Sequence, residues 1–237
     1  MHDSLLAARE PVFALVCVTL SFIAYFFIMQ GAWLTSKVMK RYGAEGVKSH
    51  LVVWQRLTGF FFLGFIPFSL ALILFRKSPA DYGLGFENFD ESLLWVLGFA
   101  AIILPMNYFN ARTAQNRSVY PQMRISEWTI KLVWTNAWSW MAYLFAYELL
   151  FRGLLLFGTQ PYLGNVTAIA LNVTIYTLVH IPKGYKETLG SIPLGIVLCL
   201  LTLETGTIWV AFLTHVLLAL SNDYFALAAH PDMRMKR

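Results

Sequence analysis

The sequence predicts an all-α fold: a multi-pass transmembrane helical bundle of about seven spans, or eight with a short re-entrant segment, around a polar intramembrane cavity. Three observations predict it. Of the 237 residues, 58% are hydrophobic and 13% are charged, whereas soluble chains average about a quarter charged residues. Apolar runs of nearly 20 residues, the length that spans a bilayer as a helix, recur along the chain. Ionisable residues nevertheless lie within some of these runs.

The predicted spans follow these apolar runs in chain order. They lie at about 12–34, 57–75, 92–109, 134–158, 164–181, 189–204 and 207–228. We expect the polar segments between them, including 35–56, to be loops. The segment 124–136 mixes charged and aromatic residues, so we expect an amphipathic helix lying flat at the membrane interface there. No repeat is visible, and residues 1–237 are expected to form a single membrane domain.

Lys and Arg between the apolar runs predict an orientation, because cytoplasmic loops carry an excess of basic residues. With the N-terminus outside, the outer segments hold only Arg9, Arg76 and Lys77. The inner segments then hold Lys37, Lys40, Arg41, Lys48, Arg112, Arg117, Arg124, Lys183, Lys186, Arg234, Lys236 and Arg237. We therefore expect an integral membrane protein of the bacterial inner membrane, N-out and C-in. The net charge of +5 is mostly loop charge, and nucleic acid is not an expected partner.

Glu148 and Arg152 lie within the run 134–158. A charge near the bilayer centre costs roughly 3 kcal/mol on insertion scales, so it needs a partner or a function. Residues four apart are neighbours on a helix face, which allows these two to pair. The pattern fits a structural ion pair that neutralises itself, and it fits equally well part of a functional site.

His180, His215 and Asn222 are the other polar residues of interest. His180 ends the run 164–181 just before Pro182 and Gly184, and irregular backbone at membrane depth is tolerated chiefly within protein or beside a cavity. His215 and Asn222 lie seven apart in the run 207–228, and this spacing places them on one helix face. Together with Glu148, these groups could hold and activate water.

A metal ion is an open alternative for the same residues. A carboxylate and two imidazoles form a common catalytic zinc set, so Glu148, His180 and His215 could be metal ligands. The chain has no local zinc motif such as His-Glu-x-x-His to decide the matter. The predicted depths of the residues differ, because Glu148 lies near the middle of its run and His180 at the end of its own. Either the fifth helix is shifted or water reaches inward to Glu148.

Three ordered motifs resemble those of the CPBP family of intramembrane proteases, which includes CAAX prenyl endopeptidases and bacteriocin-processing or immunity proteins. The family's Glu-Glu-x-x-x-Arg is similar to Tyr147–Arg152, its Phe-x-x-x-His to Tyr176–His180, and its third motif to Thr205–Trp209 leading to His215. The resemblance covers about residues 136–225, which would form the catalytic core. Two positions depart from it: Tyr147 replaces the first Glu, and Ala219 replaces the Asn four residues after His215.

The resemblance implies a helical bundle in which the first Glu and the first His polarise a water, while the second His and the Asn stabilise the oxyanion. Carried onto this sequence, Glu148 would activate water with His180 as its partner. His215 and Asn222 would be the oxyanion donors, and Arg152 would orient Glu148. The family has been described both as zinc metalloproteases and as metal-free glutamate proteases, and both remain open here.

The leading hypothesis is therefore an intramembrane endopeptidase that cleaves a membrane-associated or prenylated peptide. Its expected partners are that peptide or protein substrate and the lipid bilayer. The alternative is a non-proteolytic CPBP-like membrane binding or immunity protein, because Tyr147 stands where the family has its first Glu. A small proton-coupled transporter ranks third, because the chain lacks the inverted hydropathy repeat that many such folds show.

Overall fold

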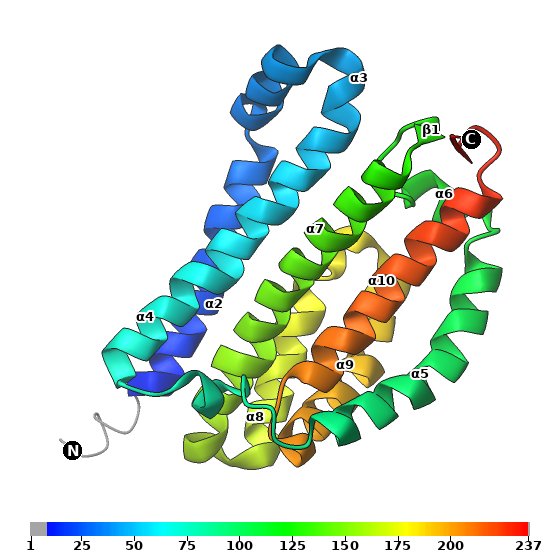
Figure 1. Ribbon diagram of the computed structural model, residues 1–237. Coiled ribbons are helices and arrows are strands. Elements are labelled where there is room, and N and C mark those ends of the chain that lie inside the picture. Colours follow the sequence, from blue (N-terminus) through cyan, green and yellow to red (C-terminus); the bar gives the residue numbers. More distant parts are fainter. Residues whose placement is uncertain (1–8, 237) are drawn as a thin grey trace.

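The computed structural model describes residues 9–236, which are mostly helical, and it confirms the predicted all-α class (Figure 1). Residues 1–8 and 237 belong to the predicted domain, and Arg237 to the predicted inner basic residues, but they lie outside the described part. In chain order the elements are α2 (Arg9–Gln30), α3 (Ala32–Gly59), η1 (Phe60–Phe65), α4 (Ile66–Phe75), η2 (Pro79–Tyr82), α5 (Phe89–Asn110), α6 (Ala114–Val119), β1 (Glu127–Trp128), α7 (Ile130–Glu148), η3 (Leu149–Phe157), α8 (Gly158–Leu178), η4 (Ile181–Lys183), α9 (Tyr185–Thr205), α10 (Trp209–Ala229) and β2 (Arg234–Met235).

Six continuous helical stretches within the described residues are long and apolar enough to cross a membrane, by length and composition. Large apolar side chains point outward from them, including Phe27, Ile73 and Val166, as contact with lipid tails would require. The predicted runs 134–158 and 164–181 both belong to one stretch, Ile130–Leu178. A count of seven or eight spans therefore stays a prediction.

Gly164 divides this longest stretch into two arms. Its backbone has φ 75° and ψ 163°, a conformation that glycine adopts at no steric cost. The chain reverses there, and Asn172 Nδ2 on the second arm donates a hydrogen bond of 2.6 Å to the Phe151 carbonyl on the first. Tyr147 on the first arm and Tyr176 on the second consequently lie side by side, with ring centroids 5.9 Å apart. The predicted difference in depth between Glu148 and His180 is absent, because the first arm continues beyond residue 158 and the chain turns only at Gly164.

The segment 35–56, expected as a loop, is helical within α3 apart from a break at Gly43, where φ is 71°. Leu34 and Val38, four residues apart, are buried, while Lys40 and Arg41 are exposed. Figure 1 shows this end of α3 standing beyond the end of α7. The loop prediction was wrong because the charged residues belong to a helix that extends past the bundle.

The expected interfacial helix at 124–136 is also absent from the structure. Glu127 and Trp128 form β1, which pairs in parallel with β2 near the C-terminus. Helix α7 begins only after Thr129, whose side-chain oxygen accepts a hydrogen bond of 3.2 Å from the Leu132 N–H. This helix-capping contact and the strand pairing replace the predicted amphipathic helix.

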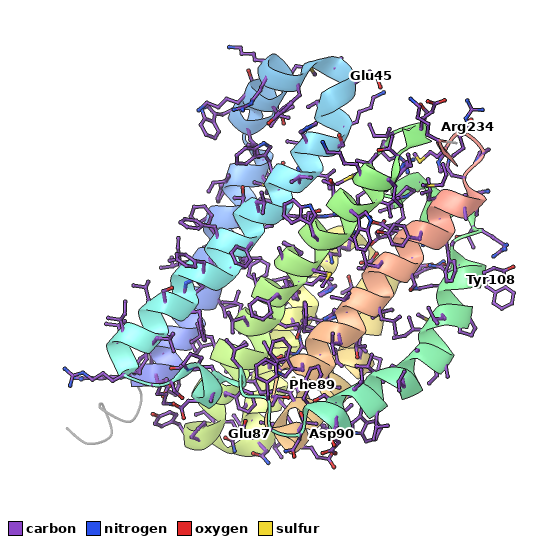
Figure 2. The ribbon with its side chains drawn as sticks, in the orientation of Figure 1. Glu45, Glu87, Phe89, Asp90, Tyr108 and Arg234 are labelled. Carbon is purple, nitrogen blue, oxygen red and sulfur yellow. The ribbon has the colours of Figure 1, made fainter. Side chains whose placement is uncertain are left out.

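Charged residues lie at the two ends of the bundle. Figure 2 shows Glu45 and Arg234 at one end and Glu87 and Asp90 at the other. The start of α2 and the C-terminal strand also lie at opposite ends (Figure 1). This distribution is the one expected of helices whose middle parts are in hydrocarbon and whose ends are in water.

Gly64 of η1 allows close packing against α7. A Cβ added at Gly64 would lie 2.5 Å from Ala146 Cβ and 2.8 Å from Ala146 Cα. We expect Gly64→Ala to lower the free energy of unfolding by roughly 1–3 kcal/mol, because the helix backbones must separate. Thermal unfolding in detergent measures this. The matched control is Gly98→Ala on α5, where a new Cβ meets nothing within 4 Å; equal melting temperatures for the two variants would contradict the packing account.

A buried polar network joins α3, α7 and α10. The Arg56 guanidinium donates to Asn136 Oδ1 and to Ser139 Oγ, both at 2.9 Å, and lies 3.8 Å from Asp223 Oδ2. Asp223 in turn accepts hydrogen bonds from Asn136 Nδ2 at 3.0 Å and Trp140 Nε1 at 2.7 Å. Buried charges are tolerated when they are paired and hydrogen-bonded, so this network fixes the three helices against one another.

Candidate active site

Glu148 and Arg152 lie at the junction of α7 and η3, and both are 0% exposed. Arg152 Nη1 lies 3.2 Å from Glu148 Oε2, so the pair expected from their spacing is present. The Arg152 guanidinium also lies over the Tyr176 ring, 4.4 Å from its centroid. The η3 segment is a π-helix, a wider turn that is frequent at functional sites.

His215 reaches Glu148 from α10. Helix α9 ends at Gly206, which has φ 71° and reverses the chain toward α10, as left-handed glycines commonly do at helix ends. His215 Nδ1 contacts Glu148 Oε1 directly, and Tyr176 Oη lies 2.8 Å from His215 Nε2. A neutral imidazole satisfies both contacts when Nδ1–H donates to the carboxylate and Nε2 accepts from the phenol. Arg152 Nη1 also donates a hydrogen bond of 3.4 Å to Glu148 Oε1, so the arginine and the histidine share this oxygen, while Oε2 has, among the described residues, only the ion-pair contact with Arg152.

His180 follows the end of α8 and faces Tyr147. Its Nδ1 lies 2.6 Å from the Tyr176 carbonyl oxygen, so in the neutral ring Nδ1 carries the proton and Nε2 keeps a free lone pair. The Tyr147 hydroxyl lies 3.5 Å from the same Nδ1, at the limit of a hydrogen bond. The Tyr147 ring is edge-on to both imidazoles, 6.1 Å from His180 and 6.4 Å from His215. Tyr147 therefore packs against both histidines.

These contacts give Glu148 a different partner from the one predicted. The sequence hypothesis paired Glu148 with His180, whereas the structure places His215 against Glu148 and Tyr147 against His180. Adjacent residues on a helix differ by about 100° around its axis. Tyr147 consequently faces the end of α8 while Glu148 faces α10.

Asn222 lies apart from the Glu148 group. It is two turns further along α10 than His215, and its Oδ1 accepts a hydrogen bond of 2.9 Å from Asn116 Nδ2 of α6. The motif position itself holds Ala219, which packs against an apolar cluster that includes Trp140 and Phe212. The structure does not bring the expected oxyanion amide to Glu148.

A metal site is not formed by the residues that the structure describes. Among residues 9–236, no group of three or more His, Cys, Asp or Glu side chains is placed to share an ion. His215 Nδ1 is engaged by the Glu148 carboxylate and His180 Nδ1 by a backbone carbonyl, so these two nitrogens are not free to bind an ion. The side chains of residues 9–236 therefore do not fit a shared metal ion.

Tyr176 is a site residue to which the sequence reasoning gave no role. Its hydroxyl bonds His215, its carbonyl bonds His180, and its ring carries the Arg152 guanidinium. Its spacing of four residues from His180 was visible in the second motif. The contact with His215 was not, because it depends on how α8 and α10 pack.

The helical bundle defines an integral membrane protein, and its interior holds a buried carboxylate in contact with a guanidinium and an imidazole. Residues 129–221 match the model of a family described as "Type II CAAX prenyl endopeptidase Rce1-like". The match confirms the predicted resemblance to the CAAX protease family, and it supports an enzyme of the protease class. Searches of curated proteins and of solved structures found no match.

Proposed function

We propose that this protein is an intramembrane endopeptidase that cleaves a membrane-associated or prenylated peptide. The observation that carries the proposal is the buried Glu148, held between Arg152 and His215 inside the segment that matches the protease family. A carboxylate needs such partners to remain charged in a bilayer. The same arrangement makes it a positioned proton acceptor.

In the proposed reaction, Glu148 and His215 act together as the proton-accepting pair. A water held by the free Nε2 of His180 gives its proton to this pair, and its oxygen bonds to the carbonyl carbon of the scissile peptide. The carbon–nitrogen bond then breaks, and the proton passes to the leaving amine. The products are a new carboxyl group and a new amine. Arg152 and Tyr176 position the pair and take no proton.

The charge bias of the loops supports an N-out, C-in orientation, and the placement of the start of α2 and of β2 at opposite ends (Figure 1) agrees with it. His180 lies on the arm that ends near Lys183 and Lys186. The substrate would then approach from the side that carries most of the basic residues.

The test is cleavage of a farnesylated peptide by the purified protein in lipid nanodiscs, followed by mass spectrometry. We expect two products whose combined mass equals the mass of the substrate plus one water. The same peptide without its prenyl group is the control for membrane association, and we expect it to be cleaved more slowly. A native protein that cleaves neither peptide, beside a Tyr147→Glu variant that does, would show a degenerate enzyme and contradict the proposal.

A further inference from the structure

Segment η3 has an unusual backbone that begins directly after Glu148. It is a π-helix of nine residues, Leu149–Phe157, whereas π-helices occur mostly as single wide turns within α-helices. The Arg152 guanidinium reaches Glu148 from inside this segment. Each hydrogen bond of a π-helix spans five residues instead of four, so the angle between Glu148 and Arg152 around the helix axis differs from its value in an α-helix. The direction of the Arg152 side chain therefore depends on the wide turn.

Asn172 of α8 bonds to the backbone of this π-helix. Its Nδ2 donates a hydrogen bond of 2.6 Å to the carbonyl oxygen of Phe151, the residue before Arg152. Asn172, Phe151 and Arg152 are all 0% exposed, so water cannot take the place of this donor. A buried hydrogen bond that loses one partner leaves the other without compensation. The Phe151 peptide is thus held by a side chain from another helix.

The Asn172 amide is in turn oriented by α9. Cys199 Sγ donates a hydrogen bond of 3.3 Å to Asn172 Oδ1. A backbone carbonyl can only accept, so the amide group that faces Phe151 must be the NH₂ and the oxygen must face the thiol. Asn172 consequently joins α8, α9 and η3 at a point one residue away from Arg152.

The contacts of Asn172 give it no direct part in the reaction. In the described part of the chain, its side chain forms hydrogen bonds with Phe151 and Cys199 and is absent from the wall of the cavity next to Tyr147. That cavity has a volume of about 520 Å³, and its charged wall residues are Arg56, Arg124 and Lys183. A ligand in the cavity would not touch Asn172. An effect of Asn172 on cleavage must therefore act through the backbone that it holds.

We propose that Asn172 is a positioning residue, which holds the π-helical turn through the Phe151 carbonyl and thereby turns Arg152 toward Glu148. The inference rests on the proposed function, because it concerns the geometry of that site. Without the Nδ2 donor, the turn relaxes toward an ordinary α-helix and the guanidinium moves relative to the carboxylate. A small displacement of a group that orients a general base lowers the rate of the chemical step. Binding of the substrate is unaffected, because Asn172 does not line the cavity.

The first test compares Asn172→Leu with the native protein on a farnesylated peptide in nanodiscs. Leucine has nearly the size of asparagine but no donor. We expect kcat to fall by about 10- to 100-fold, whereas KM should stay within about twofold of the native value. Asn165→Leu is the matched control, because Asn165 is exposed on the same helix. It should keep both constants.

An infrared measurement separates positioning from a loss of stability. The band of the Glu148 carboxylate is the difference between the spectrum of each protein and that of its Glu148→Gln form. Where that form does not fold, the Glu148→Gln/Arg152→Gln form is the reference. We expect the band to shift in Asn172→Leu and not in Asn165→Leu, because the frequency of a carboxylate depends on its ion pair. If Asn172 served only the fold, the melting temperature would fall and the band would stay in place.

Two results would overturn the inference: an Asn172→Leu protein with the native kcat, or one whose Glu148 band is unshifted. The infrared measurement needs no cleavage. A band that shifts in Asn172→Leu, beside a native protein that cleaves no peptide, therefore contradicts the proposed function and not the positioning of Arg152 by Asn172. An active native protein whose band does not respond to Asn172→Leu contradicts only the inference.

Discussion

Glu148→Gln is expected to lower the rate of peptide cleavage by about 10³-fold, within the range for removal of a general base. Glutamine keeps the size of the side chain and its contact with His215 but cannot accept the proton of water. The measurement is the initial rate of product formation in nanodiscs, with melting temperature recorded in parallel. Glu204→Gln is the matched control, because Glu204 is exposed near the end of α9, and its rate should equal that of the native protein.

Loss of folding could imitate loss of catalysis, since Glu148→Gln leaves the buried Arg152 charge without its carboxylate. Such unpaired buried charges cost roughly 3–5 kcal/mol. Glu148→Gln/Arg152→Gln removes both charges and should melt at a higher temperature than the single variant. It should still be inactive. Recovery of cleavage in the double variant would show that Glu148 serves only the fold.

Asp223→Ala is expected to lower the free energy of unfolding by roughly 3–5 kcal/mol, because Arg56 is left as an uncompensated buried charge. Asn136 and Trp140 also lose an acceptor. Chemical unfolding in mixed micelles measures the change. Asp232→Ala, at an exposed position after α10, is the control and should change stability by less than about 0.5 kcal/mol.

The double variant Arg56→Met/Asp223→Leu separates charge from packing in this network. Replacing both members of a buried pair by apolar residues is often neutral or stabilising, so we expect it to recover much of the loss. A double variant as unstable as Asp223→Ala would contradict a network held by charge compensation.

Hydropathy was sufficient to predict the helical class, because each apolar run of nearly 20 residues became part of a long helix. The Glu148–Arg152 pair was also predictable, because a spacing of four residues fixes neighbours on one helix. The contact between Glu148 and His215 was not predictable from the sequence. It depends on the rotation of α7 and on the turns at Gly164 and Gly206, which decide that α10 rather than the end of α8 faces the carboxylate.

The burial of Arg56 could not be predicted from the sequence, for a second reason. Arg56 lies at the end of a charged segment that was expected to be a loop, yet it belongs to α3 and is buried against α7 and α10. Its partner Asp223 lies next to Asn222 in the last apolar run. No local sequence pattern links Arg56 with Asp223, because their contact is created by helix packing. Helix packing likewise creates the cavity that Arg56, Arg124 and Lys183 line.

We expect Glu148 to activate water although Tyr147 stands where the family has its first Glu. The most direct test compares the initial cleavage rates of the native protein, Tyr147→Phe and Glu148→Gln on one farnesylated peptide. We predict that the native protein is active, that Tyr147→Phe stays within about tenfold of it, and that Glu148→Gln falls by about 10³-fold. A Glu148→Gln protein that is folded and as active as the native one would contradict the claim.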